Sequence, residues 1–293
     1  MASRRRHARC RVSYLDRIAE CNAHDPANFV PFVVAGASVG RIKHGFARRL
    51  KDFSDAFSVT DGGVTTAPGL DTYEARTAAA DSALQRLAET GDIPGWRGEA
   101  YPVGGPFAGP HLMAIERAAI PFFGVRAYGV HVNGFVRDED GAVRMWIARR
   151  AAGKQTYPGM LDNMIAGGQP IGIGVMENVI KEAAEEAAVP FEFARRAVAA
   201  GEVSYRQETE HGFKPDVMFA FDLELPAGFR PANTDGEVAE FYLWPIERVM
   251  ETVAETREFK FNCNLIVIDF LIRHGLIGPE RPDYMEIVEC LRR

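Results

Sequence analysis

Alternating apolar and polar positions divide the chain into a first part of mixed short elements and a second part that is richer in strands. In the first part the pattern predicts strands and helices: strands over 29–35 and 39–42, and helices over 13–21, 48–53, 72–90 and 114–118. Glycines and prolines crowd residues 95–110, which indicates turns. A boundary near Pro121 therefore separates a smaller N-terminal α+β domain, residues 1–121, from a second domain, residues 122–293.

The second part begins with two apolar runs around a polar turn at residues 137–141, which is typical of a β-hairpin. The remaining elements are predicted from periodicity: strands over 127–136, 142–149, 197–207, 216–225 and 239–244, and helices over 246–255, 264–274 and 284–292. Strands therefore surround a central segment, residues 167–189, that has a different character.

That central segment is a glycine-rich loop, residues 167–174, which runs into an acidic helix. Glu182, Glu185 and Glu186 share one face of the helix, because residues three and four apart are neighbours there. Three like charges repel unless a cation lies among them, and a hard divalent cation prefers oxygen ligands. A run of this kind is more often a solvated helix face. Here an apolar stripe leaves the acidic face pointing away from the core: Met176, Val179, Ile180, Ala183, Ala184 and Ala187. Loop and acids together favour Mg²⁺-assisted chemistry on a diphosphate.

The segment resembles the signature of the Nudix hydrolases, in which a glycine precedes Arg-Glu and then a Glu-Glu pair. Glu182, Glu185 and Glu186 match the three helix carboxylates of that signature, and Lys181 stands where the family has Arg. Ala188 replaces the later Gly, and Ile173 replaces the first Glu, so this chain lacks one acid. The family glycine corresponds to Gly167 or, with a shorter loop, to Gly168.

The run from Lys154 to Asn163, together with Ala166-Gly167-Gly168 and Glu177-Asn178, resembles one subgroup more closely. This subgroup is the thiamine-pyrophosphokinase-related Nudix proteins of plants and fungi, and the resemblance covers most of the chain. It implies an α/β/α sandwich with a mixed sheet, preceded by the N-terminal domain. It also implies hydrolysis of thiamine diphosphate-like compounds, including damaged forms, to a monophosphate. The subgroup's name does not imply kinase activity.

The resemblance also assigns roles to individual residues. Glu185 and Glu186 would hold Mg²⁺, with Mn²⁺ as the alternative, and Gly167 or Gly168 would add a carbonyl. Glu182 would orient or deprotonate the attacking water, or share a second metal. Family members often recruit another acid from a later loop, and Glu237 and Glu240 are the candidates. Glu240 is favoured, since it begins the strand predicted over 239–244 and would be held more rigidly.

Substrate-binding candidates lie close to the same loop. Lys154 and Lys214 would meet phosphate, and the chain near Gly168 would contact the substrate. Tyr157, Phe213 and Trp244 could stack on a flat heterocycle, although core packing suits Trp244 better. Three alternatives remain: a hydrolase of nucleoside diphosphate derivatives, a non-catalytic Nudix-fold binding module, and an isoprenoid diphosphate isomerase. The isomerase needs a cysteine before the glycine loop, and residues 161–165 contain none.

Composition narrows the class of protein further. The 293 residues are 47% hydrophobic and 25% charged, as in ordinary soluble proteins, and the net charge of −6 argues against a nucleic-acid partner. The four cysteines form no CxxC pair, which favours a reducing cytoplasm and gives no zinc motif. The basic start at residues 1–7 lacks an apolar signal core, and no apolar run is long enough to span a membrane. We therefore expect a cytoplasmic protein with a small-molecule diphosphate substrate. The sequence does not determine the oligomeric state.

Overall fold

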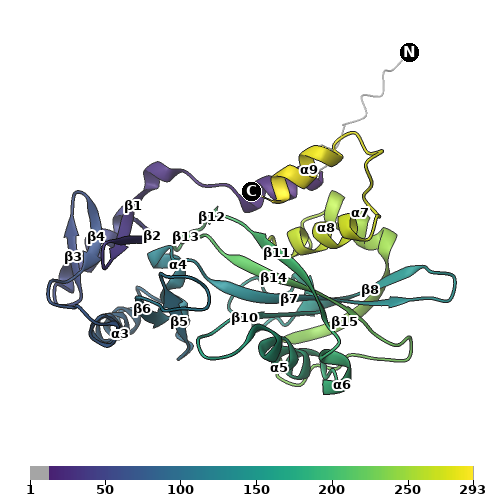
Figure 1. The fold of residues 1–293 in the computed structure, drawn as a ribbon, viewed down its shortest axis with the longest axis horizontal. Helices are drawn as coiled ribbons and strands as arrows, with labels where there is room; N and C mark the ends of the chain where they lie inside the picture. Colours follow the sequence, from purple (N-terminus) through teal and green to yellow (C-terminus); the bar gives the residue numbers. More distant parts are fainter. Residues whose placement is uncertain (1–12, 293) are drawn as a thin grey trace, which may run out of the picture.

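The computed structural model describes residues 13–292 and contains two packed parts, each with its own sheet (Figure 1). The basic start at residues 1–7, and Cys10 with it, lie outside the described residues. Within residues 13–292, no helix combines the length and the apolar character that a membrane crossing requires.

The first part is built on a four-stranded sheet in the order β2-β1-β4-β3, in which β1 and β4 run parallel. Its strands are β1 (Phe29–Val34), β2 (Ala37–Lys43), β3 (Phe57–Thr60) and β4 (Gly63–Thr66). A separate hairpin pairs β5 (Ala100–Val103) with β6 (Met113–Glu116). The helices are α2 (His44–Arg49), α3 (Tyr73–Glu89) and α4 (Ile120–Phe123), with 3-10 turns at 26–28, 50–52 and 117–119.

Two sequence predictions for this part need correction. Residues 114–118, predicted as a helix, lie mostly in strand β6, because Met113, Ala114 and Ile115 are all buried in the hairpin. The pattern also missed the β3–β4 hairpin, whose strands are too short for a clear alternation. The long helix is confirmed as α3, and the Thr72 side chain caps its first turn by accepting from the Ala75 amide at 3.1 Å.

The second part is a seven-stranded mixed sheet in which β14 and β7 are parallel neighbours. Its main path is β11 (Val198–Ser204), β14 (Val217–Glu224), β7 (Tyr128–Arg137), β8 (Val143–Arg150) and β15 (Val238–Pro245). Two short strands, β9 (Leu161–Asn163) and β10 (Ile165–Gly168), pair with β8 and β7. A small pair, β12 (Gln207–Glu208) with β13 (Phe213–Lys214), lies between the two parts (Figure 1).

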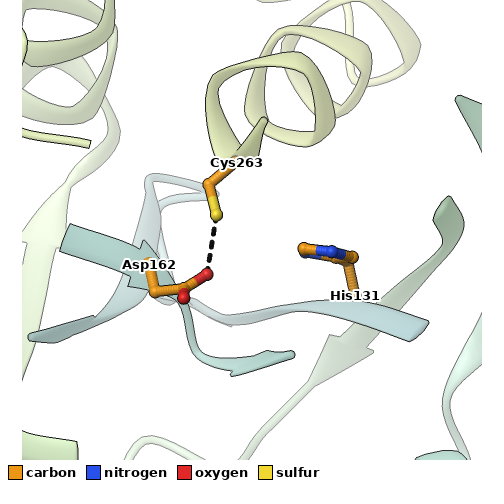
Figure 2. Close-up of side chains that lie close together, drawn as sticks. All are labelled: His131, Asp162 and Cys263. Carbon is orange, nitrogen blue, oxygen red and sulfur yellow. Dashed lines mark hydrogen bonds between the residues drawn. The ribbon is translucent and has the colours of Figure 1, made fainter. Parts of the chain in front are cut away.

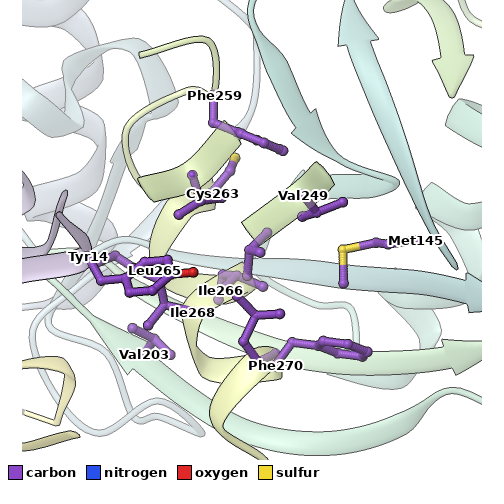
Figure 3. Close-up of a cluster of buried hydrophobic side chains, with 14 of the residues drawn as sticks. Tyr14, Met145, Val203, Val249, Phe259, Cys263, Leu265, Ile266, Ile268 and Phe270 are labelled. Carbon is purple, nitrogen blue, oxygen red and sulfur yellow. The ribbon is translucent and has the colours of Figure 1, made fainter. Parts of the chain in front are cut away.

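Helices cover both faces of this sheet (Figure 1). One face carries α5 (Val175–Ala187) and α6 (Phe191–Ala194). The other carries α7 (Ile246–Glu255), α8 (Cys263–Arg273) and α9 (Tyr284–Leu291). Every residue of α8 from Cys263 to Leu271 is buried, and its side chains fill the core in Figure 3. The predicted α/β/α sandwich with a mixed sheet is confirmed.

The first helix does not pack with the rest of the first part. Ser13 caps α1 (Tyr14–Cys21), whose Tyr14, Ile18 and Cys21 are buried in the same core as α8 and α9. The core of the first part begins only at Phe32 and ends at Val125. The boundary near Pro121 stays a prediction, but α1 shares its core with the later residues.

Candidate active site

A cavity of about 340 Å³ lies where the two parts meet. The first part lines it with Arg97, Glu99, Tyr101 and Arg117. The second part lines it with the end of the glycine loop, the acidic face of α5, and the loops before β9, β14 and α8. A cleft between two packed units is a frequent ligand site. Lys154, Lys181, Glu182, Glu185, Lys214 and Glu237 thus line one cavity, whereas Glu186 and Glu240 are not part of its lining.

Asn178 holds the glycine loop against helix α5. Its side chain is fully buried and donates to the Gly168 carbonyl at 2.8 Å and to the Gln169 side chain at 3.1 Å. The Gln169 side chain in turn donates to the backbone carbonyl of Ile173 at 2.7 Å. Ile173, which replaces the first Glu of the signature, therefore takes part in the hydrogen bonds that hold the glycine loop. A Cβ at Gly167 would collide with the Glu182 carboxylate. Glycine at 167 therefore lets the backbone lie directly against Glu182.

Lys181 joins two of the helix acids. Its ammonium lies 3.2 Å from Glu182 and 2.7 Å from Glu185, with Glu185 one helical turn away. Glu182 is the more enclosed acid, and burial raises its pKa, although Lys181 opposes the shift. Lys181 pairs with both acids and limits their repulsion.

Glu186 is buried rather than solvated. Only 7% of it is exposed, and one carboxylate oxygen accepts the Ala166 amide at 2.7 Å. Burial raises its pKa well above the usual value, and the nearby Asp162, Glu182 and Glu237 raise it further. The acidic face therefore does not point away from the core as a whole. Val179, Ala183 and Ala187 form the apolar stripe that packs down, whereas Met176 and Ala184 are exposed.

The structure places the two later acids in different surroundings. Glu237 lines the cavity and forms an ion pair with Lys154, which lowers the Glu237 pKa against the opposing effect of burial. Glu240 is exposed, accepts a hydrogen bond from Tyr242 at 2.6 Å, and lies outside the cavity. A bulge in β15 between Val238 and Glu240 interrupts the pairing with β8. Glu240 is not part of the cavity lining, and its proposed role as a metal ligand stays a prediction.

We expect Glu237→Gln to raise the Mg²⁺ concentration needed for half-maximal turnover by roughly tenfold, the scale of losing one supporting acid at a metal site. Glu240→Gln is the matched control, since it removes an acid of the same loop and strand that lies outside the cavity. A Mg²⁺ titration of both variants measures the effect. Equal half-saturation in Glu237→Gln and the parent would exclude Glu237 from metal binding.

Cations form another wall of the cavity. Arg150 lies 2.8 Å from the buried Asp162, and Lys260 lies 3.8 Å from it. Burial alone would raise the pKa of Asp162, but Lys260 and Arg150 outweigh it and lower that pKa to about 2. Arg150 also donates to the carbonyls of Thr156 and Tyr157, which fixes the loop that carries Lys154.

His131, Asp162 and Cys263 form a buried cluster of groups that bind metals in other proteins (Figure 2). The Cys263 thiol donates to Asp162 at 2.6 Å, and burial raises its pKa well above the usual value. Burial also lowers the pKa of His131 to about 4, so its ring is neutral at pH 7. Arg150 and Lys260 already compensate the charge of Asp162, and His131 itself lines the cavity while forming a hydrogen bond with Asn163 at 2.9 Å. We therefore describe the cluster as a support of the cavity wall. No sequence motif marks this cluster, because its members lie far apart in the chain.

The structure also places the substrate-binding candidates. Lys154, Tyr157, Gly168 and Lys214 all line the cavity. Phe213 is buried behind it and lines a neighbouring cavity, and Trp244 packs in the core, as its sequence context favoured. Sequence reasoning missed Asp216, Tyr205 and the residues of the first part. Tyr205 donates to Asp216 at 2.7 Å, and the second Asp216 oxygen is buried without a hydrogen-bond partner among the described residues.

Comparison with known proteins identifies the family. A domain of unknown function, DUF4743, matches residues 13–127. The chain is 45% identical to Nudix hydrolase 24, chloroplastic, of Arabidopsis thaliana, over 96% of this chain and 78% of that protein. It is 42% identical to Nudix hydrolase 20, chloroplastic, of the same plant, with the same two coverages. The chain therefore belongs to the Nudix hydrolase family and is an enzyme of the class that cleaves phosphoanhydrides.

Solved structures include Nudix domains of low similarity. The NUDIX domain of Shewanella oneidensis NrtR, solved with ADP ribose, is 14% identical over 52% of this chain and 90% of that chain, with a TM-score of 0.41. The names of the two Arabidopsis relatives describe those proteins as chloroplastic. A cytoplasmic location for this chain stays a prediction.

Proposed function

We propose that this enzyme is a Mg²⁺-dependent pyrophosphohydrolase that cleaves thiamine diphosphate-like compounds to a monophosphate. The observation that carries the proposal is a cavity lined by Glu182, Glu185 and Glu237, with Glu186 buried close to Glu182 and Glu237. Arg150, Lys154 and Lys260 line the same cavity. Carboxylate oxygens that can hold a metal, with guanidinium and ammonium groups in the same lining, suit a diphosphate.

The donor set fits a hard divalent cation. The carboxylates of Glu182 and Glu237 lie close enough to Glu186 to raise its pKa. Without a metal, the negative charges of these acids therefore repel one another. Bound Mg²⁺ would neutralise that charge and polarise the phosphate oxygens. Glu185 and the Gly167 carbonyl complete the proposed ligands, and Mn²⁺ is the alternative ion because it accepts the same oxygen donors.

Other residues of the site would activate the water, bind the phosphate oxygens and hold the cationic groups in position. Glu182, with a pKa raised by burial, is suited to take a proton from the attacking water at its carboxylate. Lys154 and Lys260 line the cavity and would hold the oxygens of the diphosphate. Arg150, fixed by Asp162 and two carbonyls, would keep that wall in place. The acid missing at Ile173 is offset by Glu237.

Two features of the cavity support a thiamine-like organic group. Tyr157 and Tyr205 line the same region and provide aromatic surface. Asp216 beside them offers a carboxylate oxygen without a hydrogen-bond partner among the described residues. Such an oxygen would accept from an aminopyrimidine or lie near a cationic ring. The subgroup resemblance points to the same substrates.

One observation favours nucleoside diphosphate derivatives instead. A second cavity of about 440 Å³ shares Tyr128 with the first, and its lining includes Arg41, Arg126 and Arg206. None of these three side chains forms an ion pair with another described residue, and no carboxylate lies in that lining. A cationic cavity favours a substrate with a further anionic group over one with a cationic ring.

A substrate panel with product identification tests the proposal. Thiamine diphosphate and its oxidised forms would be compared with ADP-ribose and other nucleoside diphosphate derivatives, with Mg²⁺ and with EDTA. We expect Mg²⁺-dependent release of the thiamine-type monophosphate with the highest kcat/KM. Preferential cleavage of a nucleoside compound would establish the alternative. Binding without turnover of any compound would indicate a non-catalytic module.

A further inference from the structure

We infer that the first part of the chain supplies two groups of the phosphate-binding site, the Tyr101 hydroxyl and the Arg117 guanidinium. The ligand class is the non-bridging oxygens of a diphosphate. The inference rests on the proposed function for the identity of that ligand. DUF4743, which spans these residues, has no assigned function, and nothing in the family signature lies in this region.

The first observation is the contact between the two parts at the glycine loop. The backbone amide of Ile171 in the glycine loop donates a hydrogen bond to the carbonyl of Ala100 in strand β5 at 3.4 Å. A Cβ at Gly168 would collide with the Tyr101 hydroxyl and would lie 3.3 Å from Cζ of Arg117. Both groups therefore lie directly on the backbone that follows Gly167, next to the helix acids. Glycine at 168 is needed for this approach.

The second observation is the state of the Tyr101 hydroxyl. Tyr101 is 2% exposed, lines the cavity, and its hydroxyl is buried without a hydrogen-bond partner among the described residues. Burying an unpaired hydroxyl costs free energy, so a core position without a ligand would favour Phe. Burial raises the pKa of Tyr101 to about 12, which keeps the hydroxyl protonated and able to donate at pH 7. A phosphate oxygen accepts such a donor.

The third observation is the placement of Arg117. Its guanidinium lies 3.0 Å from Glu99 and 5.8 Å from the centre of the Tyr101 ring. The Arg117 side chain is 40% exposed and lines the cavity. It is also close enough to Glu182 to lower that residue's pKa against the larger effect of burial. Arg117 thus forms a cationic neighbour to the proposed water-activating acid. A planar guanidinium there matches two phosphate oxygens at once.

The decisive experiment separates ligand binding from stability. The probe is methylenediphosphonate, a diphosphate analogue that cannot be hydrolysed, titrated by calorimetry into the full-length protein with Mg²⁺. We expect Tyr101→Phe to weaken binding about tenfold and Arg117→Gln about 10- to 100-fold, the scale of losing a hydrogen bond to a charged group. Tyr73→Phe is the matched control, since Tyr73 lies in the same part of the chain and outside the cavity.

A second measurement excludes a merely structural role. Because the Tyr101 hydroxyl is unpaired, Tyr101→Phe should leave Tm unchanged or higher while binding weakens. A lower Tm with unchanged diphosphonate binding would overturn the inference, as would parental binding in both variants. A parent protein that binds no diphosphonate would also overturn it. If the parent binds the analogue but cleaves nothing in the panel, the proposed function fails and this inference stands.

Discussion

Glu186→Gln should reduce metal-dependent turnover by a factor on the order of 10³, because a Lewis-acid contribution is worth several kcal/mol. Glu186 is the most buried of the helix acids, and its carboxylate is already oriented by the Ala166 amide at 2.7 Å. Gln can still accept that hydrogen bond, so the loss would reflect charge rather than misfolding. Unchanged turnover at saturating Mg²⁺ would reject Glu186 as a ligand.

The same substitution should stabilise the metal-free protein, and the pH dependence tests the reason. Burial raises the pKa of Glu186 in the folded state, so the parent loses stability as the pH rises above the unfolded value of about 4.3. Gln cannot ionise and avoids this loss. In EDTA, Tm of the variant should match the parent near pH 4 and exceed it near pH 8. A variant that is less stable at both pH values would contradict this account.

Glu182→Gln should lower kcat by roughly 10²–10⁴-fold, the usual contribution of a positioned general base. The Mg²⁺ concentration for half-saturation should change far less, because Glu185, Glu186 and Glu237 remain. Steady-state kinetics across a Mg²⁺ series separates the two quantities. If kcat instead recovers in excess metal, the main role of Glu182 is to hold the metal, and it does not activate the water.

Much of the second part could be predicted because its signals are local. Periodicity located the strands that became β7, β8, β14 and β15, and the helix over 246–255 matches α7. The spacing of three acids after a glycine loop brought Glu182, Glu185 and Glu186 to attention, and the loop and helix pack as one unit through Asn178. The helix periodicity and the family signature point to the same acids because the loop and the helix are contiguous in the sequence.

The rest of the site depends on contacts between distant segments. Tyr101 lies in the turn-rich stretch of residues 95–110, and Arg117 lies in a segment that the pattern assigned to a helix, so neither was marked as a site residue. Their proposed role follows from the packing of this part of the chain on the glycine loop. Glu237 lines the cavity and Glu240 does not, and no sequence pattern indicated this difference. The burial of Glu186 was hidden for a similar reason, since Ala166, which binds it, lies twenty residues earlier.

The position of α1 determines which deletion can remove the first part without disrupting the second. The described residues begin with α1 in the core of the second part, leave it after Cys21, form the first part, and return through Val125 into β7 (Figure 1). In topology, residues 29–125 are an insertion anchored at both ends, and two anchors restrict separation far more than a single linker does. A truncation at residue 121 would remove Tyr14, Ile18 and Cys21 from a core that needs them. A variant that lacks residues 29–125 and joins α1 to β7 by a short linker would keep the core of the second part intact.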